Sequence, residues 1–504
     1  MTPRIKPIHQ LAAILTILAA TAAAQNSTPT LYTRHYENVL GTSLEMKLCA
    51  PSAATEQRAE AAVLAEIDRE NAILSAWQPT SEFSRWIKTR NTPVKVSPEL
   101  LDVLALFDGW RQETGGALDA SAETAVRVWK TAEADHRQPT ADELAAAVTS
   151  MQQPHWKLDR AAGTATHLDD APIALNSFAK SYITDHAASA GLAAGATGVS
   201  LNMGGDIVLR GSMTQKIAVA NPRADAENDP PLDTIQIANR TVATSGAYRR
   251  GVDINGRHFS HIIDPRTGAT AEGILSSTVI APDASEAGAL ATAFSVMTPA
   301  QSRALAARLR NVDYLLVTAS GETIASPGWA KLETAHLQPA SFSIQKKAAA
   351  AAQHLDLLIS LELASPEGGR FHRPYVAVWV EDKDHNSLKT IALWASKPRY
   401  LEDLRSYYHD AKLSSMDFTT VVSTTSATRS PGKYTLRWNG LNDAGKPVPP
   451  GHYTVLIEAA REHGTYQLMR QDIDFDGHTV QKFTLPGNTE IAGATLDYSA
   501  HPEQ

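Results

Sequence analysis

The sequence contains a single cysteine, Cys49, among 504 residues. One thiol cannot form an internal disulfide, so the chain has to be held together by buried apolar surface. Positive charge is also scarce, because 46 Lys and Arg stand against 54 Asp and Glu, a formal net charge of −8. That balance argues against nucleic acid as a partner. The length is sufficient for two or three domains with cores of their own.

Long apolar runs are missing beyond the N-terminus, so we expect no transmembrane segment. At the N-terminus itself, Arg4 and Lys6 precede a short apolar run that ends in three alanines. This order is typical of a secretory signal peptide, and a buried N-terminal helix is the alternative. We therefore predict a signal peptide over residues 1–24 and an exported, periplasmic protein, whose net charge is about −10 once these two charges are removed.

The composition changes near residues 344–353, a Lys- and Ala-rich stretch. Before it, helical and strand patterns are mixed; after it, short alternating segments dominate. The sequence thus predicts an α+β protein. Its parts are a mixed α/β domain over 25–337, a linker over 338–353 and a small antiparallel β-sandwich over 354–504.

Two helices of the first domain can be predicted from their patterns. Ser97 is typical of a helix cap, and Gly115 with Gly116 ends the helix that it begins. Val63 and Ile67 lie at helical spacing on an earlier helix and are expected in the core.

The later part contains tryptophans in apolar strands and a turn signal. Trp379, Trp394 and Trp438 are expected in the sandwich core rather than on a stacking surface. The residues at 442–445, Asn-Asp-Ala-Gly, favour a hairpin turn.

Four stretches of the first domain differ from ordinary core sequence. Each is weak by itself, because glycine turns and helix lysines are common. They are Gly204-Gly205-Asp206 after a strand, Ser245-Gly246 on an expected turn, Lys180 and Asp185 at a helix start, and His261 with Asp264 in "FSHIIDPRTGAT".

The order of these motifs resembles that of the ApbE-type FAD:protein FMN transferases, which move FMN from FAD onto a threonine or serine of an exported protein. Matching stretches run from "VLGTSLEM" at Val39 to "EAGALATAFSVM" at Met297. The β-rich tail resembles a domain of unknown function that is often appended to such enzymes. The resemblance implies attack of an acceptor hydroxyl on the FMN-side phosphorus of FAD, with AMP as the leaving group.

The resemblance also implies which residues contact FAD. Leu40 replaces a methionine of the family and keeps an apolar contact. Trp77 would stack on a ring system, with core packing as the alternative, and Asp119 would contact the ligand, with a helix cap as the alternative. His261 is the candidate for assisting the hydroxyl, with a structural role as the alternative. The implied FAD contacts are Leu40, Trp77, Ala117, Leu118, Asp119 and Lys180.

The family binds Mg²⁺ at the phosphates, and here the match is incomplete. Ser177 and Thr292 correspond to metal contacts, but Ala174 and Gly288 stand where the family has aspartates. Because a hard divalent ion prefers anionic oxygen, we expect weakened Mg²⁺ binding unless a nearby acid substitutes. The nearby acids are Asp283 and Glu286.

The expected partner is an exported acceptor protein that carries the pattern D-x-x-[S/T]-G-A-[S/T], whose last hydroxyl receives FMN. Residues 264–270 fit this pattern, so Thr270 is a candidate for self-modification; we favour a loop beside the flavin site. The rival functions are a catalytically impaired periplasmic FAD-binding protein or redox module, and a partner-binding β domain. We expect FAD binding to require the first domain only.

Overall fold

The computed structural model describes residues 29–224, 226, 228–247, 250–334, 355–364, 373–395, 398–413, 425–426, 429, 431–461 and 465–500. The predicted signal peptide, 1–24, and the predicted linker, 338–353, lie outside these ranges. Within them, no helix combines the length and the apolar character needed to cross a membrane.

The first domain is built on an eight-stranded antiparallel sheet with the order β1-β2-β6-β7-β10-β13-β14-β15. Consecutive strands along this order pair in the antiparallel sense throughout. The strands are β1 (Thr30–Val39), β2 (Thr42–Ala50), β6 (Gly198–Met203), β7 (Asp206–Gly211), β10 (Thr241–Gly246), β13 (Ile274–Ala281), β14 (Asp313–Thr318) and β15 (Thr323–Ala325).

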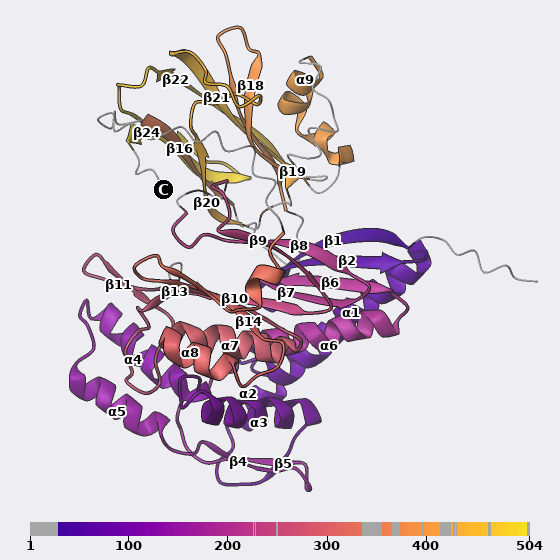
Figure 1. Cartoon of the computed structure of the whole chain (residues 1–504), viewed down its shortest axis with the longest axis vertical. Coiled ribbons are helices and arrows are strands. Elements are labelled where there is room, and N and C mark those ends of the chain that lie inside the picture. The colour runs from indigo at the N-terminus through magenta and orange to yellow at the C-terminus, as the bar shows by residue number, and fades with distance from the viewer. Residues whose placement is uncertain are drawn as a thin grey trace, which may run out of the picture.

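Helices cover one face of this sheet (Figure 1). The predicted helix cap is confirmed, because the Ser97 hydroxyl accepts a hydrogen bond from Leu100 N at the start of α3 (Pro98–Glu113). Val63 and Ile67 are buried on α1, also as predicted. The main helices of this layer are α1 (Ala53–Leu74), α3, α6 (Ala179–Ala193), α7 (Ala284–Val296) and α8 (Pro299–Ala306).

The opposite face of the sheet carries a separate small core. It is covered by the hairpin of β8 (Thr214–Val219) and β9 (Asp233–Ala238), with Ile217, Ile235 and Trp329 buried beneath it. The other elements of the domain are α2 (Glu82–Trp86), β3 (Val94–Lys95), η1 (Ala120–Ala122), α4 (Glu123–Ala134), α5 (Ala141–Met151), β4 (Trp156–Asp159), β5 (Thr164–His167), β11 (Gly251–Ile254), β12 (Arg257–Ser260) and η2 (Trp329–Lys331).

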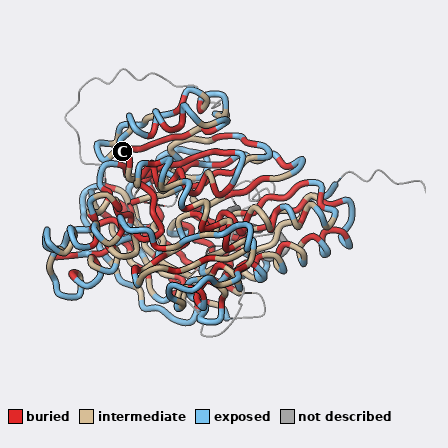
Figure 2. The backbone as a smooth tube through the Cα atoms, turned by 90° about the horizontal axis from the view of Figure 1, so that it is seen from below, coloured by how far each residue is buried: buried red, intermediate tan, exposed pale blue. Residues whose placement is uncertain are grey.

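The second domain is a β-sandwich, as predicted. Its sheets have the orders β20-β16-β24-β23 and β19-β18-β17-β21-β22, and they share one core. In the chain as a whole, buried segments run through the interior and exposed segments lie at the periphery (Figure 2). The elements are β16 (Leu355–Leu363), β17 (Tyr375–Glu381), β18 (Ser387–Trp394), η3 (Pro398–Asp403), α9 (Arg405–Leu413), β19 (Thr425–Ser426), β20 (Gly432–Trp438), β21 (Gly451–Ala460), β22 (Tyr466–Phe475), β23 (Gln481–Pro486) and β24 (Ile491–Ala500).

Three local expectations are corrected. Trp379 is buried, but its cluster lies between β17 and the η3–α9 segment rather than between the sheets. The turn at 442–445 forms and is closed by a short antiparallel bridge between Leu441 and Pro447, but β20 and β21 on either side belong to different sheets, so it does not join these two strands as a hairpin. Ser245 and Gly246 do not form a turn: they pair with Ser277 and Ser276 because β13 extends far enough to continue the ladder.

We predict a large loss of stability on truncation of Trp438 and almost none on truncation of Trp77. Trp438→Ala removes an indole that is 1 % exposed, contacts two aromatic rings and donates to Leu441 O, so it should cost about 3–5 kcal/mol of unfolding free energy. Trp77→Ala removes one that is 89 % exposed and should change it by less than about 0.5 kcal/mol. Urea unfolding followed by circular dichroism measures both. Equal losses would contradict the assignment.

Candidate functional site

Asp206 joins three elements at the start of β7. Its Oδ2 lies 3.0 Å from Lys180 Nζ and accepts a hydrogen bond from Ser181 Oγ at 3.3 Å. Its Oδ1 accepts from Thr244 N of β10 at 3.4 Å. Since Lys180 and Ser181 lie in the first turn of α6, the carboxylate fixes the start of that helix against the sheet. The predicted Lys180 and the Gly-Gly-Asp turn are thus brought together.

The hairpin tip that carries Leu40 lies against the same turn. Leu40 and Gly41 have φ values of 51° and 73°, a two-residue connection between β1 and β2. Gly204, with φ 60°, packs so closely on Thr42 that a Cβ there would lie 2.4 Å from Thr42 Oγ1. The glycine is therefore required both by its backbone conformation and by this contact. Leu40 is partly buried against the main core.

The predicted metal positions lie where α6 and α7 meet. A Cβ at Gly288 would lie 3.2 Å from the Cβ of Phe178, the residue after Ser177, and 2.8 Å from Ser181 Oγ. Thr292 follows one turn later on the same face of α7 and donates to Gly288 O at 3.2 Å. Ser177 and Thr292 offer only hydroxyls, and positions 174 and 288 supply no carboxylate. This donor set does not fit Mg²⁺, which favours anionic oxygen.

The two acids considered as replacements do not lie on that face of α7. Glu286 is two residues from Gly288, which places it about 200° away around the helix. Asp283 is the N-cap of α7, and its carboxylate accepts a hydrogen bond from Glu286 N at 2.8 Å. The helix geometry therefore disfavours both residues as ligands beside Thr292.

Asp119 has the capping role that was the alternative to ligand binding. Its Oδ1 accepts hydrogen bonds from Ser121 N and Oγ at 2.8 and 2.6 Å, and its Oδ2 lies 2.9 Å from Arg111 Nε. The side chains of Ala117 and Leu118 are buried in the main core. These two residues could therefore meet a ligand only through their backbone.

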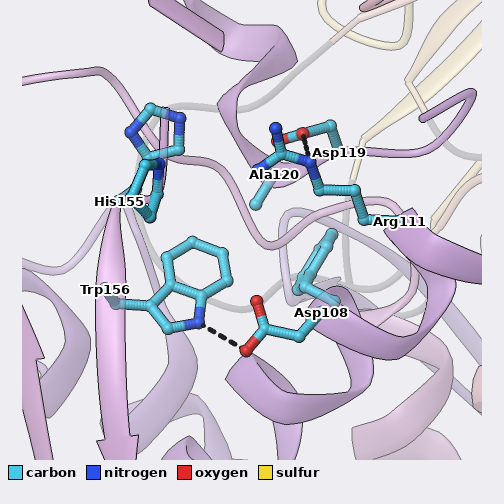
Figure 3. A pocket seen from close by; sticks show the side chains of 8 residues that line it. Asp108, Arg111, Asp119, Ala120, His155 and Trp156 are labelled. Atoms are coloured by element: carbon cyan, nitrogen blue, oxygen red, sulfur yellow. Dashed lines mark hydrogen bonds and ion pairs between the residues drawn. The ribbon is translucent and has the colours of Figure 1, made fainter. Parts of the chain in front are cut away.

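A small cavity of about 90 Å³ lies beside the Arg111–Asp119 pair (Figure 3). The buried His155 ring lines it, with Nδ1 held by Asp169 Oδ2 at 2.8 Å. Trp156 Nε1 donates to Asp108 Oδ2 at its other side. Burial raises the pKa of Asp108. Apart from Asp119, the sequence patterns did not single out the residues around this cavity, since they are held together only by tertiary contacts.

Trp77 follows the end of α1. The alternative that it packs in the core is wrong. Its side chain is 89 % exposed, and its backbone N donates to Ser75 Oγ at 3.2 Å. The exposed indole has a face available for stacking on a planar ligand. The contact with a flavin or adenine ring remains a prediction.

His261 follows β12 and is oriented by the backbone. Its Nδ1 lies 3.0 Å from Arg250 O, and because a carbonyl only accepts, Nδ1 carries the proton and Nε2 keeps its lone pair. Although His261 is exposed at the surface, partial desolvation of its ring lowers the pKa of His261, and the hydrogen bond to Arg250 O acts in the opposite direction. A neutral imidazole at pH 7 can act as a base.

The segment 264–270 is a closed loop. Asp264 accepts hydrogen bonds from Arg266 N, Nε and Nη2, and Ile263 forms an antiparallel bridge with Thr270. Trp129 Nε1 donates to Gly268 O at 2.9 Å. The loop also reaches the 115–116 turn, where a Cβ at Gly116 would lie 3.5 Å from Arg266 Cγ.

Among the described residues, one group has the spacing of a metal site: Glu66, Glu70 and His186. These residues lie on α1 and α6. The negative charges of the two glutamates are already balanced by neighbouring basic side chains. Arg69 pairs with both carboxylates at 2.7 and 3.0 Å, and His186 Nδ1 lies 2.5 Å from Glu70 Oε1. We assign it to an ion-pair network that joins the two helices.

The fold and site define a mixed α/β domain whose distant motifs meet at the Gly-Gly-Asp turn. The model of the ApbE family matches residues 40–316, and that of a "Predicted periplasmic protein (DUF2271)" matches residues 356–493. The chain belongs to the ApbE family.

Relatives and solved structures agree with this assignment. A protein of Klebsiella pneumoniae named FAD:protein FMN transferase is 27 % identical over 310 residues, covering 59 % of this chain and 87 % of the relative. One of Haemophilus influenzae with the same name is 28 % identical over 276 residues, covering 52 % and 80 %. The crystal structure of the ApbE protein of Thermotoga maritima covers 60 % of this chain and all of its own, with 26 % identity and a TM-score of 0.55.

We predict that His261 titrates below about 6.5, the ordinary value for histidine. Because the folded state disfavours the proton, the His261 contribution to stability should be present above that value and be lost as the pH falls. An NMR titration of the His261 ring measures its pKa directly, and His261→Gln should flatten the pH dependence of stability. A midpoint above 6.5 would show that desolvation of the ring does not dominate its titration.

Proposed function

We propose that this protein is an FAD:protein FMN transferase, which moves FMN from FAD to a threonine or serine of an acceptor protein and releases AMP. Membership of the ApbE family and the names of its relatives support this proposal. The observation that carries it is the convergence of motifs far apart in sequence. The Leu40 tip meets Gly204, Asp206 pairs with Lys180, and Arg266 reaches the turn before Asp119.

In this reaction the protein mainly has to position the two substrates and neutralise the charge of the phosphates. The acceptor oxygen forms a bond to the FMN-side phosphorus, the bond from that phosphorus to the bridging oxygen breaks, and AMP leaves with the electron pair. In this proposal His261 Nε2 takes the hydroxyl proton, since Nδ1 is already held by Arg250 O. Lys180, which is 31 % exposed beside Asp206, supplies positive charge for the phosphates.

We also propose that the protein works in the periplasm. Two features support this location: the charge and apolar pattern of residues 1–24, and the description of the second matched family as a predicted periplasmic protein. The acceptor would then be an exported protein with a D-x-x-[S/T]-G-A-[S/T] segment.

The second candidate function is an FAD-binding protein without transferase activity. One observation favours it: the hydroxyl-only donor set of Ser177 and Thr292, without carboxylates at positions 174 and 288. The two functions differ in whether flavin becomes covalently attached to an acceptor.

We predict covalent transfer to a peptide that carries the acceptor pattern. Incubation of the full-length protein with FAD and this peptide should add one FMN unit to the peptide, as measured by intact mass. A peptide whose last hydroxyl residue is alanine is the matched control, and Lys180→Gln should slow the transfer. Tight FAD binding without any mass gain would favour the second candidate.

We predict weak dependence of this transfer on Mg²⁺. Gly288→Asp alone should destabilise the protein by about 1–3 kcal/mol, because its Cβ would lie 2.8 Å from Ser181 Oγ. Combined with Ser181→Gly, it should tighten Mg²⁺ binding and speed transfer, since it adds an anionic ligand near Thr292. Ser181→Gly is the control. If EDTA inactivates the wild type completely, and the double variant has the same Mg²⁺ affinity and transfer rate as the wild type, the metal is held by other residues.

We predict that Thr270 is not modified in the folded protein. Its loop is closed by the bridge from Ile263, and its hydroxyl lies 3.5 Å from Glu272 Oε1, so it would have to leave this arrangement to reach a bound pyrophosphate. After incubation with FAD and denaturation, peptide mapping should find no flavin on Thr270. Flavin there that disappears in Thr270→Ala would establish self-modification, and a yield that rises with protein concentration would place it between two molecules.

A further inference from the structure

Among the described residues, the β-rich domain forms polar contacts with the first domain at two separate places. It lies over the β8–β9 hairpin, on the face of the sheet opposite the helices (Figure 1). At the first place, which we call the hairpin anchor, Asn228 exchanges two hydrogen bonds of 2.8 Å with the backbone of Arg437 on β20. The Arg437 guanidinium also pairs with Asp229 and with Asp356 of its own domain, at 3.2 and 3.0 Å.

At the second place, the strand anchor, Arg373 forms an ion pair with Glu37 of β1. Arg373 lies two residues before β17, and the side chains of the pair are only 9 % and 7 % exposed. Removing the Arg373 charge from such a buried pair would leave the Glu37 carboxylate without this counterion, which is costly. The pair is therefore a strong constraint on the position of Glu37.

Glu37 lies in an irregularity of β1, just before the β1–β2 hairpin tip that carries Leu40. Tyr36 pairs with Leu44, but Val39 pairs with Thr42, so β1 contains one residue more than β2 across this interval. Asn38 takes a φ of 60°, which is uncommon for a residue with a side chain. A bulge of this kind bends its strand and changes the direction of the residues that follow.

We infer that Arg373 of the β-rich domain is a positioning residue for the flavin site: by holding Glu37, it fixes the bulge that aims the Leu40 tip. The inference rests on the proposed function, in which Leu40 contacts FAD. The connection is short, because Leu40 follows Glu37 by three residues and the tip is already held on its other side by Gly204. The appended domain then forms part of the binding site without contacting the ligand. It follows that FAD binding does not depend on the first domain alone.

Because there are two anchors, a specific effect of Arg373 on the flavin site can be distinguished from a general effect of domain docking. Both hold the same domain, but the hairpin anchor attaches to the chain between β8 and β9, whereas the strand anchor attaches beside the Leu40 tip. If the domain only adds stability, loss of either anchor should affect FAD in the same way. If Arg373 positions Leu40, only the strand anchor should matter for the ligand.

The experiment compares full-length Arg373→Gln, Glu37→Gln and their double variant with the control Arg437→Gln. We expect the Kd for FAD, measured by flavin fluorescence, to rise roughly five- to tenfold in both strand-anchor variants, within the range of coupled contacts. The KM for FAD should rise with it at an unchanged kcat. The double variant should be no worse than the single ones, because the two residues act as a unit. Arg437→Gln should stay within about twofold of wild type.

Arg373→Lys keeps the positive charge and should retain most of the affinity for FAD. Circular dichroism of each variant tests whether a loss of affinity is only a failure to fold. An unchanged Kd in folded Arg373→Gln would overturn the inference, as would an equal rise in Arg437→Gln. Wild-type protein that binds no FAD would instead refute the proposed function, and the positioning role with it.

Discussion

The position of the candidate site depends on satisfying one carboxylate, that of Asp206. Its side chain is only 14 % exposed, so it needs partners inside the protein to offset lost hydration. Those partners come from the start of α6 and from Thr244 within β10, so the helix and the strand meet at the β6–β7 turn. Gly204 allows the turn to approach the β1–β2 tip. A single ionic and hydrogen-bonded centre thereby determines where Leu40 and Lys180 lie.

Local rules predicted much of the fold. The Ser97 cap, the core face of α1 and the sandwich of the tail follow from propensity and periodicity, which act over a few residues. The failures came from partners far along the chain. Ser245 and Gly246 are strand residues because β13 pairs with them, and the strands around 442–445 separate into two sheets. No short pattern encodes such pairing.

The site shows the same division. The Gly-Gly-Asp turn and Lys180 could be recognised as unusual from the sequence, but Ser181 could not, since its importance comes from the space that it shares with Gly288. Likewise, no pattern in the sequence indicated that Arg111 forms an ion pair with Asp119. A carboxylate at 288 and a hydroxyl at 181 compete for one volume. The absence of a carboxylate at position 288 therefore fits the packing around Ser181, and it also weakens binding of Mg²⁺.

The strand anchor has a consequence for the order in which the protein is made. Glu37 and Arg373 are separated by 336 positions, so the contact cannot form until the chain has been synthesised, and in an exported protein also translocated, well into its last third. Contacts this far apart in sequence close a large loop and tend to form late in folding. The hairpin near the N-terminus would thus reach its final shape only after the end of the protein had folded. Truncated or incompletely exported chains would carry an unfinished site.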